Sequence, residues 1–86
     1  MNYLKVAQVV PNKGMAWTYY ELNEAGDIQR ILTHIPETNE TKLYPSPKMK
    51  KLFEPERLTQ TDANEFNTIW DNSEKSATWL KTKLNA

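Results

Sequence analysis

The sequence predicts a small α+β domain in which an antiparallel sheet is followed by helices. Residues 16–35 read as two β-prone runs, rich in aromatic and β-branched residues, on either side of a short polar turn, which is typical of a hairpin. Between residues 66 and 84, apolar residues recur at helical spacing. We therefore expect one domain over residues 1–86: an antiparallel three- to four-stranded sheet, then a short helix, then a long C-terminal helix packed on one sheet face.

The first strand is expected over residues 3–10, and the turn-prone sequence 11–14 closes it. The second strand follows over about residues 15–22 and the third ends at Pro36, because proline cannot donate a hydrogen bond to a sheet. A short fourth strand at residues 42–44 is optional, since Pro45 follows directly.

Gly26 is suited to the left-handed position of a three-residue hairpin loop. That loop would place Leu22 opposite Ile28, and it would put Tyr19, Trp17 and Ile31 on one face and Leu32 on the other. In the same register Glu21 and Arg30 lie on opposite faces. A slip of one residue would exchange the faces.

Two helices are expected after the sheet. Ser46-Pro47 resembles a helix N-cap followed by proline at the first helical position, with three apolar residues facing inward over the next turns. Thr61 or Asp62 would cap the second helix, and Asp62 has capping-box spacing to Glu65. The apolar stripe of this long helix comprises Phe66, Trp70, Ala77, Leu80 and Leu84, widened by Ile69.

The composition excludes several classes of protein. The chain has no cysteine, so disulfides and thiolate zinc sites are excluded, and its 11 basic residues balance 11 acidic ones. A net charge of zero argues against a protein whose main task is to bind nucleic acid. No apolar run approaches the ~20 residues of a membrane span, and the first residues do not resemble a signal peptide. We expect a cytoplasmic protein that does not bind membranes.

No set of residues indicates catalysis. His34 is the only histidine, so neither a metal cluster nor a histidine-based triad can be assembled around it. The two glycines are isolated and form no phosphate-binding loop. We therefore expect no enzyme, no metal and no cofactor.

Binding residues are easier to nominate. The span 21–40 is strongly acidic, with Arg30 its only cation, and it adjoins the aromatic part of the hairpin. Trp79 lies off the stripe of the long helix, and exposed tryptophan is common in binding hot spots. The residues expected to bind a partner are Trp17, Tyr19, Glu21, Glu24, Asp27, Arg30, Glu37 and Trp79. The alternative is a basic surface for nucleic acid formed by Lys48, Lys50, Lys51 and Lys81.

Several short motifs resemble a family of small uncharacterised bacterial domains. They are Tyr3-Leu4-Lys5-Val6, Tyr19-Tyr20-Glu21-Leu22, Arg30 after the turn glycine, and Glu65-Phe66 with Ile69-Trp70. The resemblance covers about residues 3–70 and implies a fold but no activity. It implies that Glu21 and Arg30 are a polar pair, which the expected register does not allow. The chain departs from the family at residues 9–12, and residues 71–86 are additional.

These features favour a non-enzymatic protein-binding module of the inhibitor or immunity type. It would neutralise a toxin, a nuclease or a defence effector through charge-complementary surfaces. A phage-encoded inhibitor of a bacterial defence system is one variant of this hypothesis. The alternative is a nucleic-acid-binding accessory protein that uses Lys48–Lys51. A homodimer would form by sheet extension if the first or third strand lay at an open edge.

Overall fold

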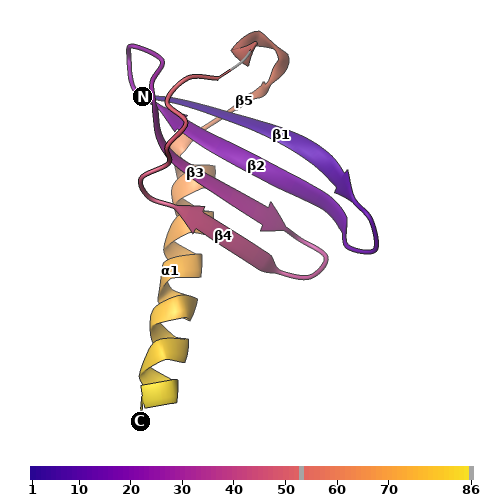
Figure 1. The fold of residues 1–86 in the computed structure, drawn as a ribbon, viewed down its shortest axis with the longest axis vertical. Helices are drawn as coiled ribbons and strands as arrows, with labels where there is room; N and C mark the ends of the chain where they lie inside the picture. The colour runs from indigo at the N-terminus through magenta and orange to yellow at the C-terminus, as the bar shows by residue number, and fades with distance from the viewer. Residues whose placement is uncertain (53, 86) are drawn as a thin grey trace.

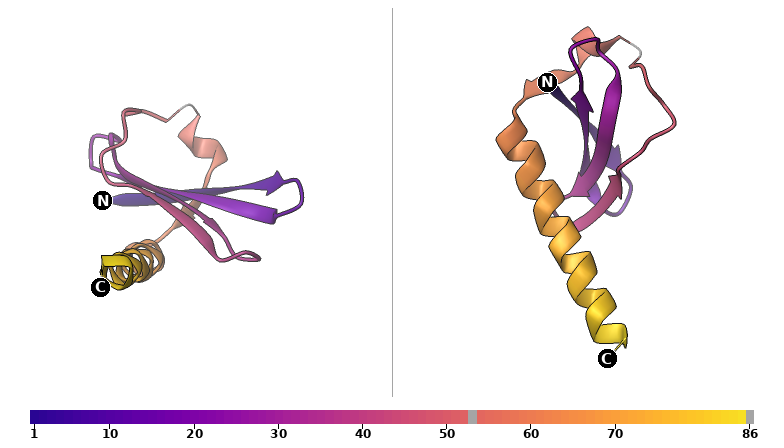
Figure 2. Two further views of the ribbon diagram at one scale, coloured as in Figure 1. Left: turned by 60° about the horizontal axis from the view of Figure 1, so that its bottom comes forward. Right: turned by 90° about the vertical axis from the view of Figure 1, so that its left-hand side faces the viewer.

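A computed structural model describes residues 1–52 and 54–85, and it describes side chains as far as Glu74. Its five strands form one antiparallel sheet, with α1 on one face and an irregular segment on the other (Figures 1 and 2). The strands are β1 (Asn2–Val10), β2 (Gly14–Leu22), β3 (Ile28–Ile35), β4 (Glu40–Tyr44) and β5 (Thr59–Thr61), and the helices are the 3₁₀ turn η1 (Pro55–Arg57) and α1 (Ala63–Asn85).

The order of strands across the sheet is β4-β3-β2-β1-β5. The first four strands form a meander, which the sequence predicts as three strands with an optional fourth. β5 was not predicted: residues 59 and 60 were expected between the two helices and Thr61 as a candidate cap of the second, but residues 59–61 pair with Tyr3–Lys5 of β1. Three residues with little apolar character give almost no sequence signal, and the pairing depends on the tertiary structure.

The short helix expected after Ser46-Pro47 is absent from the described residues of that segment. Residues 45–52 instead cross the sheet face opposite α1 as an irregular segment. The amide of Ile28 donates to the carbonyl of Lys50 at 2.8 Å, and Leu52 packs against the buried Leu22, Ile28 and Ile31. These contacts with the second apolar face stabilise an irregular conformation in place of the helix that the local sequence predicts. Met49, expected to face inward, is 47% exposed.

The prediction of a long helix packed along one sheet face was also wrong. The helical segment that packs on the sheet is short, from Ala63 to residue 74, although the backbone of α1 continues to Asn85. Phe66 and Trp70 enter a core cluster with Tyr3, Tyr19 and Leu32. This apolar patch is small enough to be covered by the first turns alone, and Figure 2 shows the later turns extending past the sheet. Ala77, Leu80 and Leu84 lie outside the residues whose side chains the structure describes.

A bulge between Glu21 and Leu22 corrects the expected hairpin register. Leu22 does pair with Ile28, as predicted, but beyond the bulge the strands shift by one residue and Glu21 pairs with Arg30. Ile31 therefore lies on the far face with Ile28, while Leu32 joins the face under α1. The predicted assignment of Ile31 and Leu32 to faces was wrong because the extra residue of the bulge was not counted.

One hairpin loop and one helix start are as the sequence predicts. Gly26 has a φ of +84° in the hairpin loop, as expected for the left-handed position. Asp62 precedes α1, and its carboxylate accepts a hydrogen bond from the backbone amide of Glu65 at 2.8 Å. No helix in the described part of the chain is long and apolar enough to cross a membrane.

Candidate functional site

The first of two polar centres is built around Glu21, a buried carboxylate at the penultimate position of β2. Arg30 on β3 donates from Nε and Nη2 to the two carboxylate oxygens of Glu21, at 2.7 Å each. The hydroxyl of Tyr3 donates to the same carboxylate at 2.8 Å. Arg30 also donates to the side-chain oxygen of Asn67 on α1 at 2.8 Å. Glu21 and Arg30 thus form a two-pronged ion pair that links the first three strands to the helix.

The guanidinium group of Arg30 is also held by aromatic rings. Its central carbon lies 4.9 Å from the ring centre of Phe66 and 4.6 Å from that of Trp70. Phe66 in turn lies 5.4 Å from the ring of Tyr3. A guanidinium stacked on aromatic faces is stabilised both by dispersion and by the ring quadrupole. The ion pair is therefore part of the contact between sheet and helix.

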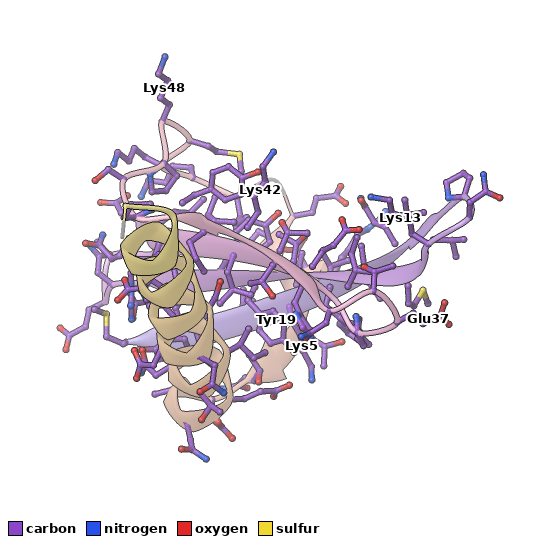
Figure 3. The ribbon with its side chains drawn as sticks, turned by 90° about the horizontal axis from the view of Figure 1, so that it is seen from below. Lys5, Lys13, Tyr19, Glu37, Lys42 and Lys48 are labelled. Atoms are coloured by element: carbon purple, nitrogen blue, oxygen red, sulfur yellow. The ribbon has the colours of Figure 1, made fainter. Side chains whose placement is uncertain are left out.

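Glu65, in the first turn of α1, forms a second polar centre. Its carboxylate accepts hydrogen bonds from Tyr19 at 2.8 Å, from the ammonium of Lys5 at 3.0 Å, and from the hydroxyl of Thr61. The Lys5 ammonium also lies 5.0 Å from the centre of the Trp17 ring. Figure 3 shows Lys5 and Tyr19 together beneath the middle of the sheet. This centre joins β1, β2 and β5 to the helix start.

Both carboxylates are held in the charged form. Hydrogen bonding to Arg30 lowers the pKa of Glu21 below its ordinary value of 4.5, and hydrogen bonding to Thr61, with Tyr19 and Lys5, lowers that of Glu65. Burial raises the pKa of Tyr19 and Tyr3, and their hydrogen bonds to carboxylates add to this shift. The carboxylates therefore stay ionised and the phenols neutral at pH 7. Groups in these states stabilise the interface of helix and sheet.

Four residues predicted to bind a partner therefore lie in or beside the protein interior. Tyr19, Glu21 and Arg30 belong to the two polar centres, and Trp17 is half-buried against the helix-side cluster. The implied pairing of Glu21 with Arg30 is present in the structure, at the bulge. The side chain of Trp79 lies outside the described residues.

The acidic residues of the 21–40 span do not gather into one surface. Glu24 and Asp27 lie at the β2–β3 turn, whereas Glu37 lies at the β3–β4 turn, at the other end of β3. Eight residues of strand separate the two groups, roughly 25 Å at about 3.3 Å per residue. Asp27 is also paired with Lys51, at 2.5 Å, which lowers its pKa. A single acidic docking face is therefore not formed.

Lys48, Lys50 and Lys51 of the alternative prediction do not lie on a helix, because the helix expected there is absent from the described residues. Lys51 is paired with Asp27, whereas Lys48 points away from the sheet (Figure 3). Lys50 is exposed in the same irregular segment. The side chain of Lys81 lies outside the described residues. The structure thus offers no regular basic groove among the lysines it describes.

Sequence reasoning missed the most exposed apolar surface, which lies at the free end of the β1–β2 hairpin. Val9 is 76% exposed and Met15, directly opposite it in the register, is 45% exposed. Ala7 and Trp17 form the next pair on the same face. We call these four residues the hairpin strip. A sequence signal was available, because Val9 lies on the same side of β1 as Lys5.

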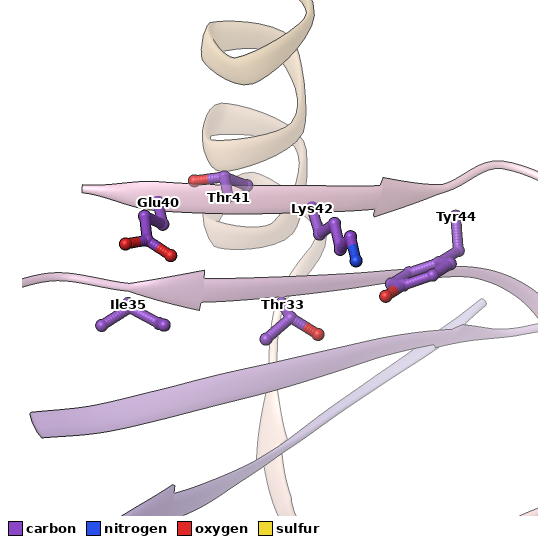
Figure 4. A pocket seen from close by; sticks show the side chains of 6 residues that line it. All are labelled: Thr33, Ile35, Glu40, Thr41, Lys42 and Tyr44. Carbon is purple, nitrogen blue, oxygen red and sulfur yellow. The ribbon is translucent and has the colours of Figure 1, made fainter. Parts of the chain in front are cut away.

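A shallow pocket of about 450 Å³ lies on the sheet face away from α1 (Figure 4). Thr33 and Ile35 of β3 and Lys42 and Tyr44 of β4 form its floor. Glu40, at its end, is bound to Lys13 at 2.9 Å. On the opposite face, His34 and the hydroxyl of Thr41 are 2.7 Å apart. Among the described residues, no group of three or more histidine, aspartate or glutamate side chains could hold a metal ion.

Comparison with known proteins gives no further guide to function. No family model, no curated protein and no solved structure matches this chain. The resemblance to a family of small bacterial domains therefore stays a prediction.

Proposed function

We propose that this protein is a non-enzymatic protein-binding module of the inhibitor type, and that it holds its partner at the hairpin strip. The supporting observation is the exposure of Val9 and Met15 side by side at the end of a hairpin that extends beyond α1 (Figure 1). Large apolar side chains that are paired and exposed are typical of interaction sites.

The surroundings of the strip favour a protein as its partner. Glu37 lies next to Gly14 at this end of the hairpin, and Lys13 and Glu40 form an ion pair at the same end of the sheet, on its opposite face (Figure 3). Charged residues near an apolar patch are common at protein interfaces. The strip lies on the face of a two-stranded ribbon, so it suits another protein surface better than an enclosed small molecule.

The two polar centres support a binding function over a catalytic one. Glu21 and Glu65 are the carboxylates nearest the core, and each is committed to several donors that connect the sheet to α1. Acid–base catalysis requires a group whose pKa lies near the working pH, and these pKa values are shifted away from it. We prefer the protein partner to nucleic acid because Lys51 is neutralised by Asp27 and residues 45–52 form no basic helix.

Affinity capture with matched variants tests this proposal. Met15→Glu places a charge in the strip, whereas Met49→Glu makes the same change at a methionine of nearly equal exposure, 47% against 45%, in a different part of the surface. We expect a partner protein bound by the wild type and by M49E to be lost, or weakened at least about tenfold, with M15E. Purified partner and isothermal titration give the ratio.

Circular dichroism should show that both variants are folded. The proposal fails if M15E binds the partner as well as M49E does. It also fails if the bound species proves to be nucleic acid, which nuclease treatment and a steep salt dependence would reveal.

A further inference from the structure

One strand of the sheet is only half covered at its edge. β1 pairs with β2 along its whole length, from Asn2 to Val10, but β5 covers only Tyr3–Lys5 on the other side. Within the described part of the chain, Val6–Val10 have no strand on that side. Alternate residues of an antiparallel strand direct their amide and carbonyl groups to each side, so part of this backbone faces outward without a strand partner.

The sequence of this open segment does not protect it. Val-Ala-Gln-Val-Val contains neither charge nor proline, and three of its five residues are β-branched. The opposite edge strand, β4, differs in both respects: it carries Glu40 and Lys42, and Pro45 follows it. Charges and proline are the usual means by which edge strands avoid association. β4 is therefore protected, whereas the outer part of β1 is suited to pairing.

We propose that two copies of this chain associate by antiparallel pairing of their Val6–Val10 edges about a two-fold axis at Gln8. In that register Gln8 faces Gln8 of the second copy, Ala7 faces Val9, and Val6 faces Val10. No charged residue meets another across the joint. This homodimer extends each five-stranded sheet into the other.

The limits of the open segment match this register. At the N-terminal end of the segment, the last residue of β1 that β5 covers is Lys5, which pairs with Thr59. At the other end, Pro11 begins the hairpin turn, in which the amide of Lys13 donates to the carbonyl of Val10 at 3.0 Å. The five residues between these limits are centred on Gln8, so a two-fold axis there uses all of them and no others. A second copy of this chain thus matches the open segment in length and in sequence.

The dimer goes beyond the proposed function, which a monomer could also perform. Val9 and Ala7 point to the same face of β1 as Trp17 and Tyr19. Pairing would set Val9 of one copy beside Ala7 of the other, so the two hairpin strips would form one continuous apolar surface. The partner would then meet a symmetric surface of twice the size.

Light scattering on the full chain over a wide concentration range tests the dimer. We expect the wild type to be dimeric at high concentration. Gln8→Lys would place two like charges opposite each other at the axis and weaken association by about fivefold. The matched control is Gln29→Lys, which makes the same change at an exposed residue of β3, a strand paired on both sides. It should leave association unchanged.

A crosslinking experiment tests the register directly. The chain contains no cysteine, so Gln8→Cys introduces a single thiol. Opposite residues of antiparallel strands have Cα atoms about 4.5–5.5 Å apart, within the range of a disulfide. Mild oxidation should convert Q8C to a covalent dimer and leave Gln29→Cys monomeric, apart from slow random coupling.

The results separate this inference from the proposed function. A wild type that stays monomeric at every concentration overturns the dimer, and so does a dimer that Q8K does not weaken or Q8C does not crosslink. Loss of the partner with M15E, in a protein that is monomeric, would support the proposed function alone. A crosslinked Q8C dimer whose partner binding is unaffected by M15E would support the dimer alone.

Discussion

Glu21 is a buried charged residue of the interior. Its side chain is 7% exposed and is bound by Arg30 and Tyr3. Because the folded state lowers the pKa of Glu21, and likewise that of Glu65, below 4.5, both carboxylates contribute stability above that pH. This contribution is lost as the pH falls through the lower, folded-state values. The free energy of unfolding from urea titrations should therefore decline below about pH 4.5.

Glu21→Gln should lower the free energy of unfolding at pH 7 by about 2–3 kcal/mol, because it leaves the half-buried Arg30 without its counter-charge. The same variant should flatten the acid side of the pH profile, since one of the two titrating carboxylates is gone. Glu24→Gln, at an exposed turn, is the control and should change stability by less than about 0.5 kcal/mol. An E21Q profile parallel to that of the wild type would contradict this assignment.

The tyrosines act at the other end of the pH scale. Burial raises the pKa of Tyr3 and Tyr19 above 10.0 in the folded protein. Stability linked to them is complete below pH 10 and is lost as the pH rises, because the unfolded chain then ionises first. The hydroxyl of Tyr3 donates to Glu21 and that of Tyr19 to Glu65, so each of these two hydrogen bonds requires a neutral phenol.

At the scale of the element, the first turn of α1 is capped by the side chain of Asp62. The carboxylate of Asp62 accepts from the amide of Glu65, as the capping-box spacing predicts. Asp62→Ala should therefore cost about 1 kcal/mol in urea unfolding. Asn72→Ala, on the exposed face of the same helix, should cost nothing or stabilise slightly through helix propensity. Equal losses in both variants would show that the cap is unimportant.

The sequence was informative for elements with a local signal. The first three strands, an optional fourth, the Gly26 loop and a helix cap at Thr61 or Asp62 each depend on neighbouring residues, and each was predicted. β5 and the irregular cover over residues 45–52 depend on partners far away in the chain, Tyr3–Lys5 and Ile28, so neither could be read locally. Ser46-Pro47 has the sequence pattern of a helix start. The segment that follows it is nevertheless irregular, because it packs on the sheet face opposite α1.

The candidate site also combines features that the sequence indicates with features that depend on distant residues. Glu21 and Arg30 were singled out by resemblance, and the expected register then separated them. One bulged residue decides whether they face each other, and a short loop sequence does not fix its position. The exposure of Val9 and Met15 could not be predicted either, because it depends on where β5 and α1 end.

At the scale of the whole molecule, the two apolar clusters lie on opposite faces of one shared sheet. Ile28 and Leu32 are both fully buried, the first under the irregular segment and the second under α1. Ile28→Ala and Leu32→Ala should each lower the free energy of unfolding by about 2–5 kcal/mol. Val9→Ala, at an exposed position, should change it by less than about 0.5 kcal/mol.

Because the strands between the clusters are common to both, neither face should unfold alone. Far-ultraviolet circular dichroism and tryptophan fluorescence should give coincident unfolding curves for the wild type and both core variants. A fluorescence transition that precedes the dichroism transition in L32A would show that α1 detaches from an intact sheet.

The half-covered edge of β1 also bears on how the strand exchanges its amide hydrogens with solvent. Residues 3–5 lie between two strands, whereas residues 6–10 lie beside one. In dilute solution, deuterium should therefore enter the second half of β1 well before the first, although both belong to one continuous strand. Slower uptake over residues 6–10 as the protein is concentrated would report the covering of that edge, residue by residue.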